Sequence, residues 1–177
     1  MRFKIVVAAT ALAAFSVALA GNVQAFAAPG ADLSKYKTFK MLPTRVLTSS
    51  GIQENDPTYS PYILAAVRKE LKGKGLTEVT ENPDMEVATG ALARAFPQLE
   101  ALIYSFAYGT DWGTGPIATV GRYNKEGSVL VNMIDPRTKK SVWIGMASRA
   151  WGKPSTVDSM IGKATEQLFK QYPALNP

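Results

Sequence analysis

Two stretches of the chain repeat apolar residues at the spacing of an amphipathic α-helix. The first follows Asp56-Pro57, carries apolar residues at positions 59, 63, 66, 67 and 71, and stops at Gly73 or Gly75. The second follows Ser155, repeats apolar residues at positions 157, 160, 161, 164 and 168, and stops at Pro173. Aspartate and serine accept hydrogen bonds from the unpaired amides of a first turn, and glycine or proline ends a helix. The pattern therefore predicts two helices, each with one apolar face.

The other apolar positions alternate or form short runs, as in β-strands. We expect strands over residues 36–41, 76–80, 85–92, 117–123, 127–135 and 140–151, whereas residues 44–56 are polar and rich in turn formers. The turn Asp135-Pro136-Arg137-Thr138 should join the last two strands as a hairpin. Together these elements predict an α+β fold, a two-layer sandwich in which a mostly antiparallel sheet of about five or six strands carries both helices on one face.

The last predicted strand has apolar residues on both of its sides. Val142, Ile144 and Met146 fall on one side, and Trp143, Gly145 and Ala147 fall on the other. A strand of this kind needs a cover over each face. We expect the second face of the sheet to be buried by the aromatic segment described below, by a partner, or by a second copy in a homodimer.

The first 25 residues have the layout of a signal peptide. Arg2 and Lys4 precede an alanine-rich apolar run of 16 residues, and Val23 and Ala25 suit the −3 and −1 sites of a signal peptidase. We predict a leader over residues 1–25 that is cleaved after Ala25, with a second frame after Ala27, then a linker over residues 26–34 and a single domain over residues 35–177. The alternative is a retained membrane anchor, for which the apolar run is short.

Two residue types are missing from the chain, and their absence narrows the chemistry. There is no cysteine and no histidine. A bacterial lipoprotein needs a cysteine at its processing site, so we expect no lipid anchor and a periplasmic or secreted protein. The absence of cysteine excludes thiol nucleophiles and thiolate metal sites. The absence of histidine removes the commonest general base and the commonest transition-metal ligand. We therefore expect no catalytic residue, no metal site and no cofactor.

Charge gives a mild preference for anionic partners. The chain has 20 basic and 14 acidic residues, and the loss of residues 1–25 leaves a net charge of +4. That balance favours contact with lipid headgroups or acidic polymers, although it is also ordinary for a soluble domain. The basic residues form small groups at Lys35-Lys37-Lys40, Arg68-Lys69-Lys72-Lys74 and Arg137-Lys139-Lys140. No basic arm or stripe appears, and we expect no nucleic-acid partner.

The segment from 95 to 115 combines aromatic side chains with glycines. Aromatic rings stack on sugars or fill pockets of a partner, and glycines let a loop adapt. We take Tyr104, Tyr108 and Trp112 as candidate contacts of a non-catalytic module that binds an envelope protein, a glycan or lipid headgroups. In the alternative interpretation, Phe96, Phe106 and Trp112 only cover the second face of the sheet.

A hydrolase acting on envelope polysaccharide is the second functional hypothesis. Glu100, Asp111 and Glu126 flank the aromatic segment. Glycoside hydrolysis needs two carboxyl groups separated by roughly 5–9.5 Å across a cleft. The enzyme hypothesis therefore requires two of these acids to converge without being held by local hydrogen bonds.

Several short motifs occur together in one family. They are Tyr36-Lys37-Thr38-Phe39, Lys74-Gly75 at the end of the first helix, Asn82-Pro83-Asp84, Gly127-Ser128-Val129-Leu130-Val131, Ile134-Asp135-Pro136-Arg137-Thr138 and Val142-Trp143-Ile144-Gly145. With them the chain resembles the DUF4136 family over about residues 32–173, most specifically in the hairpin from 127 to 147. Members are small bacterial envelope proteins, often lipoproteins, without an established activity. The resemblance implies the fold and the compartment and leaves the function open.

Overall fold

The computed structural model describes residues 23–28, 30–48, 50–92, 127–148 and 157–172. Within them the strands are β1 (Val23–Ala27), β2 (Thr38–Met41), β3 (Arg45–Thr48), β4 (Gly51–Glu54), β5 (Thr77–Glu78), β6 (Met85–Leu92), β7 (Ser128–Asp135) and β8 (Lys140–Ser148). The helices are α1 (Ser60–Gly73) and α4 (Val157–Phe169), with a short 3-10 helix, η1, at Leu33–Lys35. The strand expected at 117–123 lies outside the described residues.

These strands form one mixed sheet. Its order is β1-β8-β7-β6-β2-β5, and β3 also pairs with β6 and holds β4. The pairs β1/β8, β8/β7, β7/β6 and β3/β4 are antiparallel, whereas β2/β6, β2/β5 and β3/β6 are parallel. The predicted α+β class is confirmed, and within the described residues the sheet has eight strands, more than the five or six expected.

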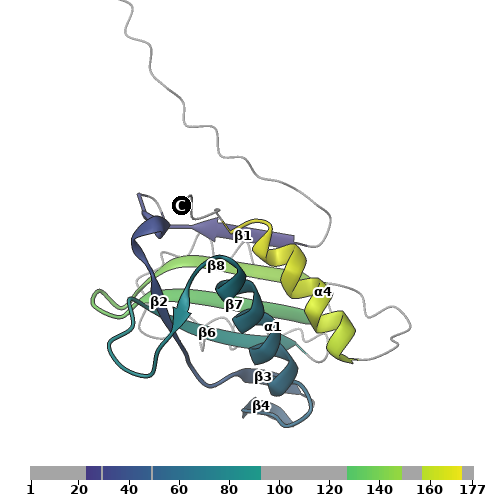
Figure 1. Cartoon of the computed structure of the whole chain (residues 1–177). Helices are drawn as coiled ribbons and strands as arrows, with labels where there is room; N and C mark the ends of the chain where they lie inside the picture. The colour runs from purple at the N-terminus through teal and green to yellow at the C-terminus, as the bar shows by residue number, and fades with distance from the viewer. Residues whose placement is uncertain (1–22, 29, 49, 93–126, 149–156, 173–177) are drawn as a thin grey trace, which may run out of the picture.

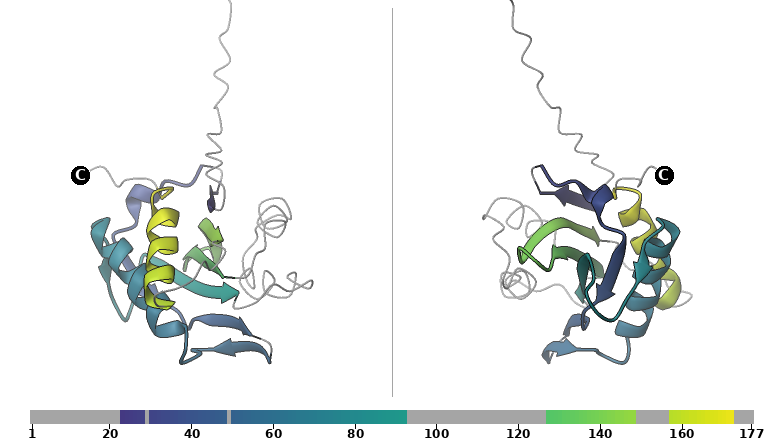
Figure 2. Two further views of the ribbon diagram at one scale, coloured as in Figure 1. Left: turned by 90° about the vertical axis from the view of Figure 1, so that its right-hand side faces the viewer. Right: turned by 60° about the vertical axis from the view of Figure 1, so that its left-hand side comes forward.

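Both helices pack side by side on one face of the sheet, as predicted (Figures 1 and 2). The helix α1 buries Ile63, Val67 and Leu71. Asp56 accepts hydrogen bonds from the backbone N–H groups of Thr58 and Tyr59, at 2.9 and 3.0 Å. The predicted cap therefore organises the turn before α1, because the helix itself begins only at Ser60.

The polar stretch from 44 to 56 contains a hairpin that its sequence pattern does not show. β3 and β4 pair from Arg45 with Glu54 to Thr48 with Gly51, and the Arg45 and Glu54 side chains form an ion pair at 3.1 Å. Among the described residues of this hairpin, only Val46 is fully buried. Ile52, Gln53 and Glu54 are exposed and β3 is otherwise half-buried, so the alternation that would reveal the strands is weak. What fixes β3 is its parallel pairing with the end of β6.

The N-terminal strand β1 lies at the outer edge of β8. Its residues pair antiparallel from Val23 opposite Ala147 to Ala27 opposite Trp143. The predicted leader and linker divide this segment after Ala25, whereas the structure has a strand that is continuous across Ala25. The end of the expected linker overlaps the first two residues of η1, Leu33 and Ser34.

A glycine in β8 sets how closely α4 approaches the sheet. The ring of Trp143 and the side chain of Leu168 occupy the space over Gly145, and a methyl group there would lie 2.5 Å from an atom of each. Trp143 also contacts Phe169 at the end of α4 and Tyr172 just beyond it, with ring centroids 5.8 and 5.4 Å apart. These aromatic contacts depend on a residue without a side chain at position 145.

We predict that Gly145→Ala destabilises the fold by about 1–3 kcal/mol, the cost typical of overpacking a core. Gly162→Ala is the matched control, because among the described residues no atom outside its chain neighbours and the backbone of α4 lies within 4 Å of the added methyl group. It should stabilise by about 0.5–1 kcal/mol through helix propensity. Urea unfolding of both variants tests the pair, and a Gly145→Ala chain as stable as wild type would contradict the packing described here.

Candidate functional site

A buried carboxylate lies where β7 ends. The side chain of Asp135 is only 5% exposed. It accepts hydrogen bonds from the hydroxyl of Tyr36 at 3.1 Å and from the backbone N–H and guanidinium of Arg137 at 2.9 and 3.2 Å. The ammonium of Lys35 lies 3.9 Å away. One carboxylate therefore ties the β7–β8 turn to the segment between η1 and β2.

The turn after Asp135 directs its side chains outward. The backbone N–H of Lys139 donates to the carbonyl of Asp135 at 2.8 Å. Lys139 closes the turn with a φ of 57°, a left-handed conformation that non-glycine residues adopt mainly in turns. Residues 137–140 are all exposed as a result.

The hydrogen bonds at Asp135 help to set the protonation states of Asp135 and Tyr36. Those from the Arg137 side chain and backbone, with that from Tyr36, lower the pKa of Asp135 from 3.8 to about 2. Burial, followed by the hydrogen bond to Asp135, raises the pKa of Tyr36 to about 12. At neutral pH the carboxylate is therefore ionised and the phenol is a neutral donor.

A second carboxylate at this end is also committed to the backbone. Asp84 accepts hydrogen bonds from the backbone N–H groups of Lys37 and Thr38 at 3.0 and 2.9 Å and from the Thr38 hydroxyl at 2.9 Å. These bonds lower the pKa of Asp84, and the charge of Arg137 contributes in the same direction. Asp84 therefore fixes the start of β2 against the turn before β6.

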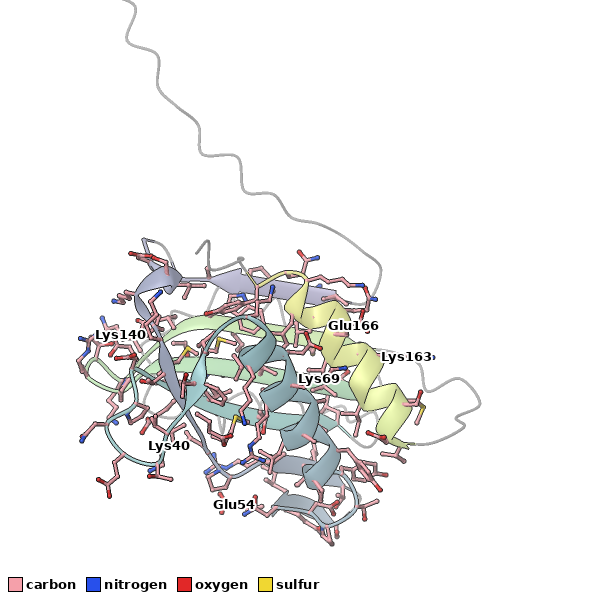
Figure 3. All side chains as sticks on the ribbon, viewed as in Figure 1. Lys40, Glu54, Lys69, Lys140, Lys163 and Glu166 are labelled. Carbon is pink, nitrogen blue, oxygen red and sulfur yellow. The ribbon has the colours of Figure 1, made fainter. Side chains whose placement is uncertain are left out.

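Two basic groups that are distant in sequence meet at this end of the sheet. We call this surface the basic end; its members are Lys35, Lys37, Lys40, Arg137, Lys139 and Lys140, all of them exposed. Figure 3 shows Lys40 and Lys140 at the same end of the molecule, away from Lys163 on α4. Within the described segments 32–40, 81–86 and 135–140, the exposed carboxylates are Asp32 and Glu81. The basic end therefore exposes six cations, whereas the carboxylates of Asp84, Glu86 and Asp135 are half-buried or buried beneath them.

Contacts inside the basic end keep two of the lysines close to the sheet. Lys35 lies over the ring of Tyr36, with its ammonium 4.9 Å from the ring centroid. Lys139 pairs with Glu86 of β6 at 3.7 Å. For Lys37 and Lys40, no side-chain hydrogen bond or ion pair links them to another described residue. These two side chains are the best placed to meet an external anion.

The second face of the sheet is buried as well, as the pattern in β8 predicts. Leu92, Leu130 and Met146 form a cluster there, and Phe26 and Leu47 pack against it. The predicted cover, the segment from 95 to 115, lies outside the described residues. The candidate contacts Tyr104, Tyr108 and Trp112 lie there too, and so do the acids of the hydrolase hypothesis, Glu100, Asp111 and Glu126.

Sequence reasoning did not identify the basic end. Its two groups were noted separately, but nothing local indicates that they meet, because Tyr36 and Asp135 are 99 residues apart. Only the strand order, with β6 between β2 and β7, brings them together.

Metal binding gains no support: the described residues contain no group of three or more acidic, histidine or cysteine side chains that could hold an ion. None of the helices among the described residues is long and apolar enough to cross a membrane.

The family model described as "Domain of unknown function (DUF4136)" matches residues 23–174. The chain belongs to the DUF4136 family. No curated protein matches it. Among solved structures it is similar to a DUF4136 protein from Bacteroides thetaiotaomicron, with a TM-score of 0.60 and 15% identity over 87% of this chain and 96% of that one.

Two other similar structures carry different descriptions. One is a dodecamer of a PelC variant from Paraburkholderia phytofirmans, with a TM-score of 0.53 and 11% identity over 84% of this chain and 95% of that one. The other is a PDZ domain protein from Parabacteroides distasonis, with a TM-score of 0.51 and 18% identity over 86% of this chain and 37% of that one. At these identities the similarity shows the shared fold.

The buried carboxylate predicts how stability depends on pH. Since folding lowers the pKa of Asp135 from 3.8 to about 2, its contribution is complete above pH 4 and is lost as the pH falls towards 2. The shift corresponds to about 2 kcal/mol. Asp135→Asn should therefore be less stable at pH 7 and should lose less stability than wild type between pH 4 and 2. Urea titrations at several pH values measure this, and parallel acid curves for the two proteins would contradict it.

Proposed function

We propose that this chain is an exported, non-catalytic binding module of the cell envelope, and that its basic end holds the phosphate groups of anionic lipid headgroups. The observation that carries the proposal is the convergence of two basic groups on one exposed surface. The alternative partners are an envelope protein and an acidic glycan, and the vesicle experiment below distinguishes a lipid partner from both.

The form of the basic end favours a surface of many anions over a single small ligand. Its cations sit on separate, exposed side chains, and those of Lys37 and Lys40 have no ion-pair or hydrogen-bond partner among the described residues. These two lysines can each reach a different phosphate, and a lysine or arginine close to an anionic membrane contributes about 1 kcal/mol. A rigid pocket is not needed for that type of binding.

The acidic groups beneath this surface support a non-catalytic role. General acid or base chemistry needs a carboxyl group that can exchange a proton with a substrate. Asp135 and Asp84 each accept several structural hydrogen bonds, which lower their pKa values. No observation on the described residues favours the hydrolase hypothesis, and it stays a prediction about Glu100, Asp111 and Glu126.

Vesicle binding tests the proposed function. We expect the chain to co-sediment with vesicles containing phosphatidylglycerol and not with pure phosphatidylcholine vesicles, and the binding should weaken with salt. The double variant Lys37→Gln/Lys40→Gln should bind roughly 30-fold more weakly, at about 1 kcal/mol for each lysine.

The matched control is Lys69→Gln/Lys163→Gln, which removes the same charge from the exposed faces of α1 and α4. It should bind nearly as tightly as wild type. Equal losses of vesicle binding in the two double variants would show that only the net charge of the protein matters. Equal binding of the wild type to both types of vesicle would refute an anionic lipid partner.

We also propose self-association as a second property, supported by the fold shared with dodecameric PelC. The strand β4 lies at an edge of the described sheet and carries Ile52, which is 43% exposed. An open edge with an apolar side chain can pair with another copy. Light scattering should give a mass above that of one chain, and Ile52→Lys should lower it. Tyr62→Ser, which alters an equally exposed side chain on α1, should not. A single-chain mass for the wild type would refute self-association.

A further inference from the structure

The strand β1 is part of the folded domain. All five of its residues pair with β8, and the N–H of Ala28 extends the ladder by donating to the carbonyl of Val142 at 2.9 Å. β1 therefore covers the whole edge of β8 from residue 143 to residue 147.

Its side chains reach both layers of the core. Val23 and Ala25 pack against the main core between the sheet and the helices. Phe26 packs on the opposite face, against the cluster that contains Leu130 and Met146. The match to the DUF4136 family also begins at residue 23. Residues 23–25 thus have the contacts of domain residues and not of a discarded leader.

Cleavage after Ala25 would divide this strand. It would remove Val23, Gln24 and Ala25, which pair with Ala147, Met146 and Gly145. The backbone of β8 would lose its partner over these residues, and the core would lose two apolar side chains. An unpaired edge beside a buried strand costs stability and invites aggregation.

The sequence offers an earlier site that leaves β1 whole. Ala18 and Ala20 place small residues at the −3 and −1 positions for cleavage after Ala20. The apolar run from 5 to 17 then has a length within the usual range for a leader. Only Gly21 and Asn22 would separate the new terminus from β1.

We infer that a signal peptidase removes the leader after Ala20, so that the mature protein starts at Gly21 and keeps β1. The inference builds on the leader predicted from the sequence and fixes its end from the pairing of β1 with β8. It does not depend on which anion or partner the domain binds.

The test is the N-terminus of the exported protein. The full chain is expressed in a bacterial host, the protein is recovered from the periplasm or medium, and intact mass and N-terminal sequencing are recorded. A start at Gly21 supports the inference. A start at Phe26 or Ala28, or an unprocessed N-terminus, overturns it.

Two substitutions sharpen the result. Ala20→Leu puts a bulky residue at the −1 position and should abolish the Gly21 terminus. Ala25→Leu, the matched control, should leave the Gly21 terminus in place. Loss of processing in Ala25→Leu together with normal processing in Ala20→Leu would overturn the inference.

A measurement on folded protein checks the structural reason independently of processing. Two chains made without a leader, one starting at Gly21 and one at Phe26, are unfolded in urea. The longer chain should have the higher midpoint, because it alone has a complete β1. Identical midpoints would show that residues 23–25 add nothing to the domain and would overturn the argument for cleavage after Ala20.

Discussion

A single ionised carboxylate holds together the part of the molecule on which the proposed function depends. Asp135 is nearly inaccessible to solvent, yet hydrogen bonds from Tyr36 and Arg137 keep it charged at neutral pH. Removing one partner of such a buried group leaves an uncompensated charge, which costs far more than the bond contributes. The group therefore fixes the distance between the β7–β8 turn and β2, and with it the arrangement of the basic end.

The face of the sheet that carries the helices depends on close packing. The ring of Trp143 and the side chain of Leu168 from α4 can both approach Gly145 closely only because this residue has no side chain. The edge of β8 is closed by β1, whose Val23 and Ala25 join the same core. Thus β8 is enclosed by α4 on one face and by β1 along its edge. On the other face of β8, Met146 packs with Leu92 and Leu130, so the apolar residues on both sides of this strand are buried.

Local patterns in the sequence predicted the elements that carry their own signal. The bounds of β6 agree with the expected strand at 85–92, and the hairpin of β7 and β8 follows from its Asp-Pro turn. The hairpin of β3 and β4 was missed because few of its side chains are buried. The parallel pairing of β2 with β6 was missed because strand order is set by packing between distant segments, which local periodicity does not contain. The meeting of the two basic groups follows from that order and could not be predicted for the same reason.

The carboxylates beneath the basic end also determine which cations are available to a partner. Arg137 is 72% exposed, but its guanidinium is already hydrogen-bonded to Asp135, and its pKa is raised by that bond and by the charge of the carboxylate. An anion that drew Arg137 outward would have to replace this bond while leaving Asp135 buried, and would gain little. Lys139 is held in a similar way by Glu86, although at 3.7 Å and with more solvent around it the pair is weaker. The arginine therefore acts mainly as a structural part of the turn. Attraction to phosphate falls chiefly to the lysines of β2 and its preceding segment, whose position the same carboxylate secures.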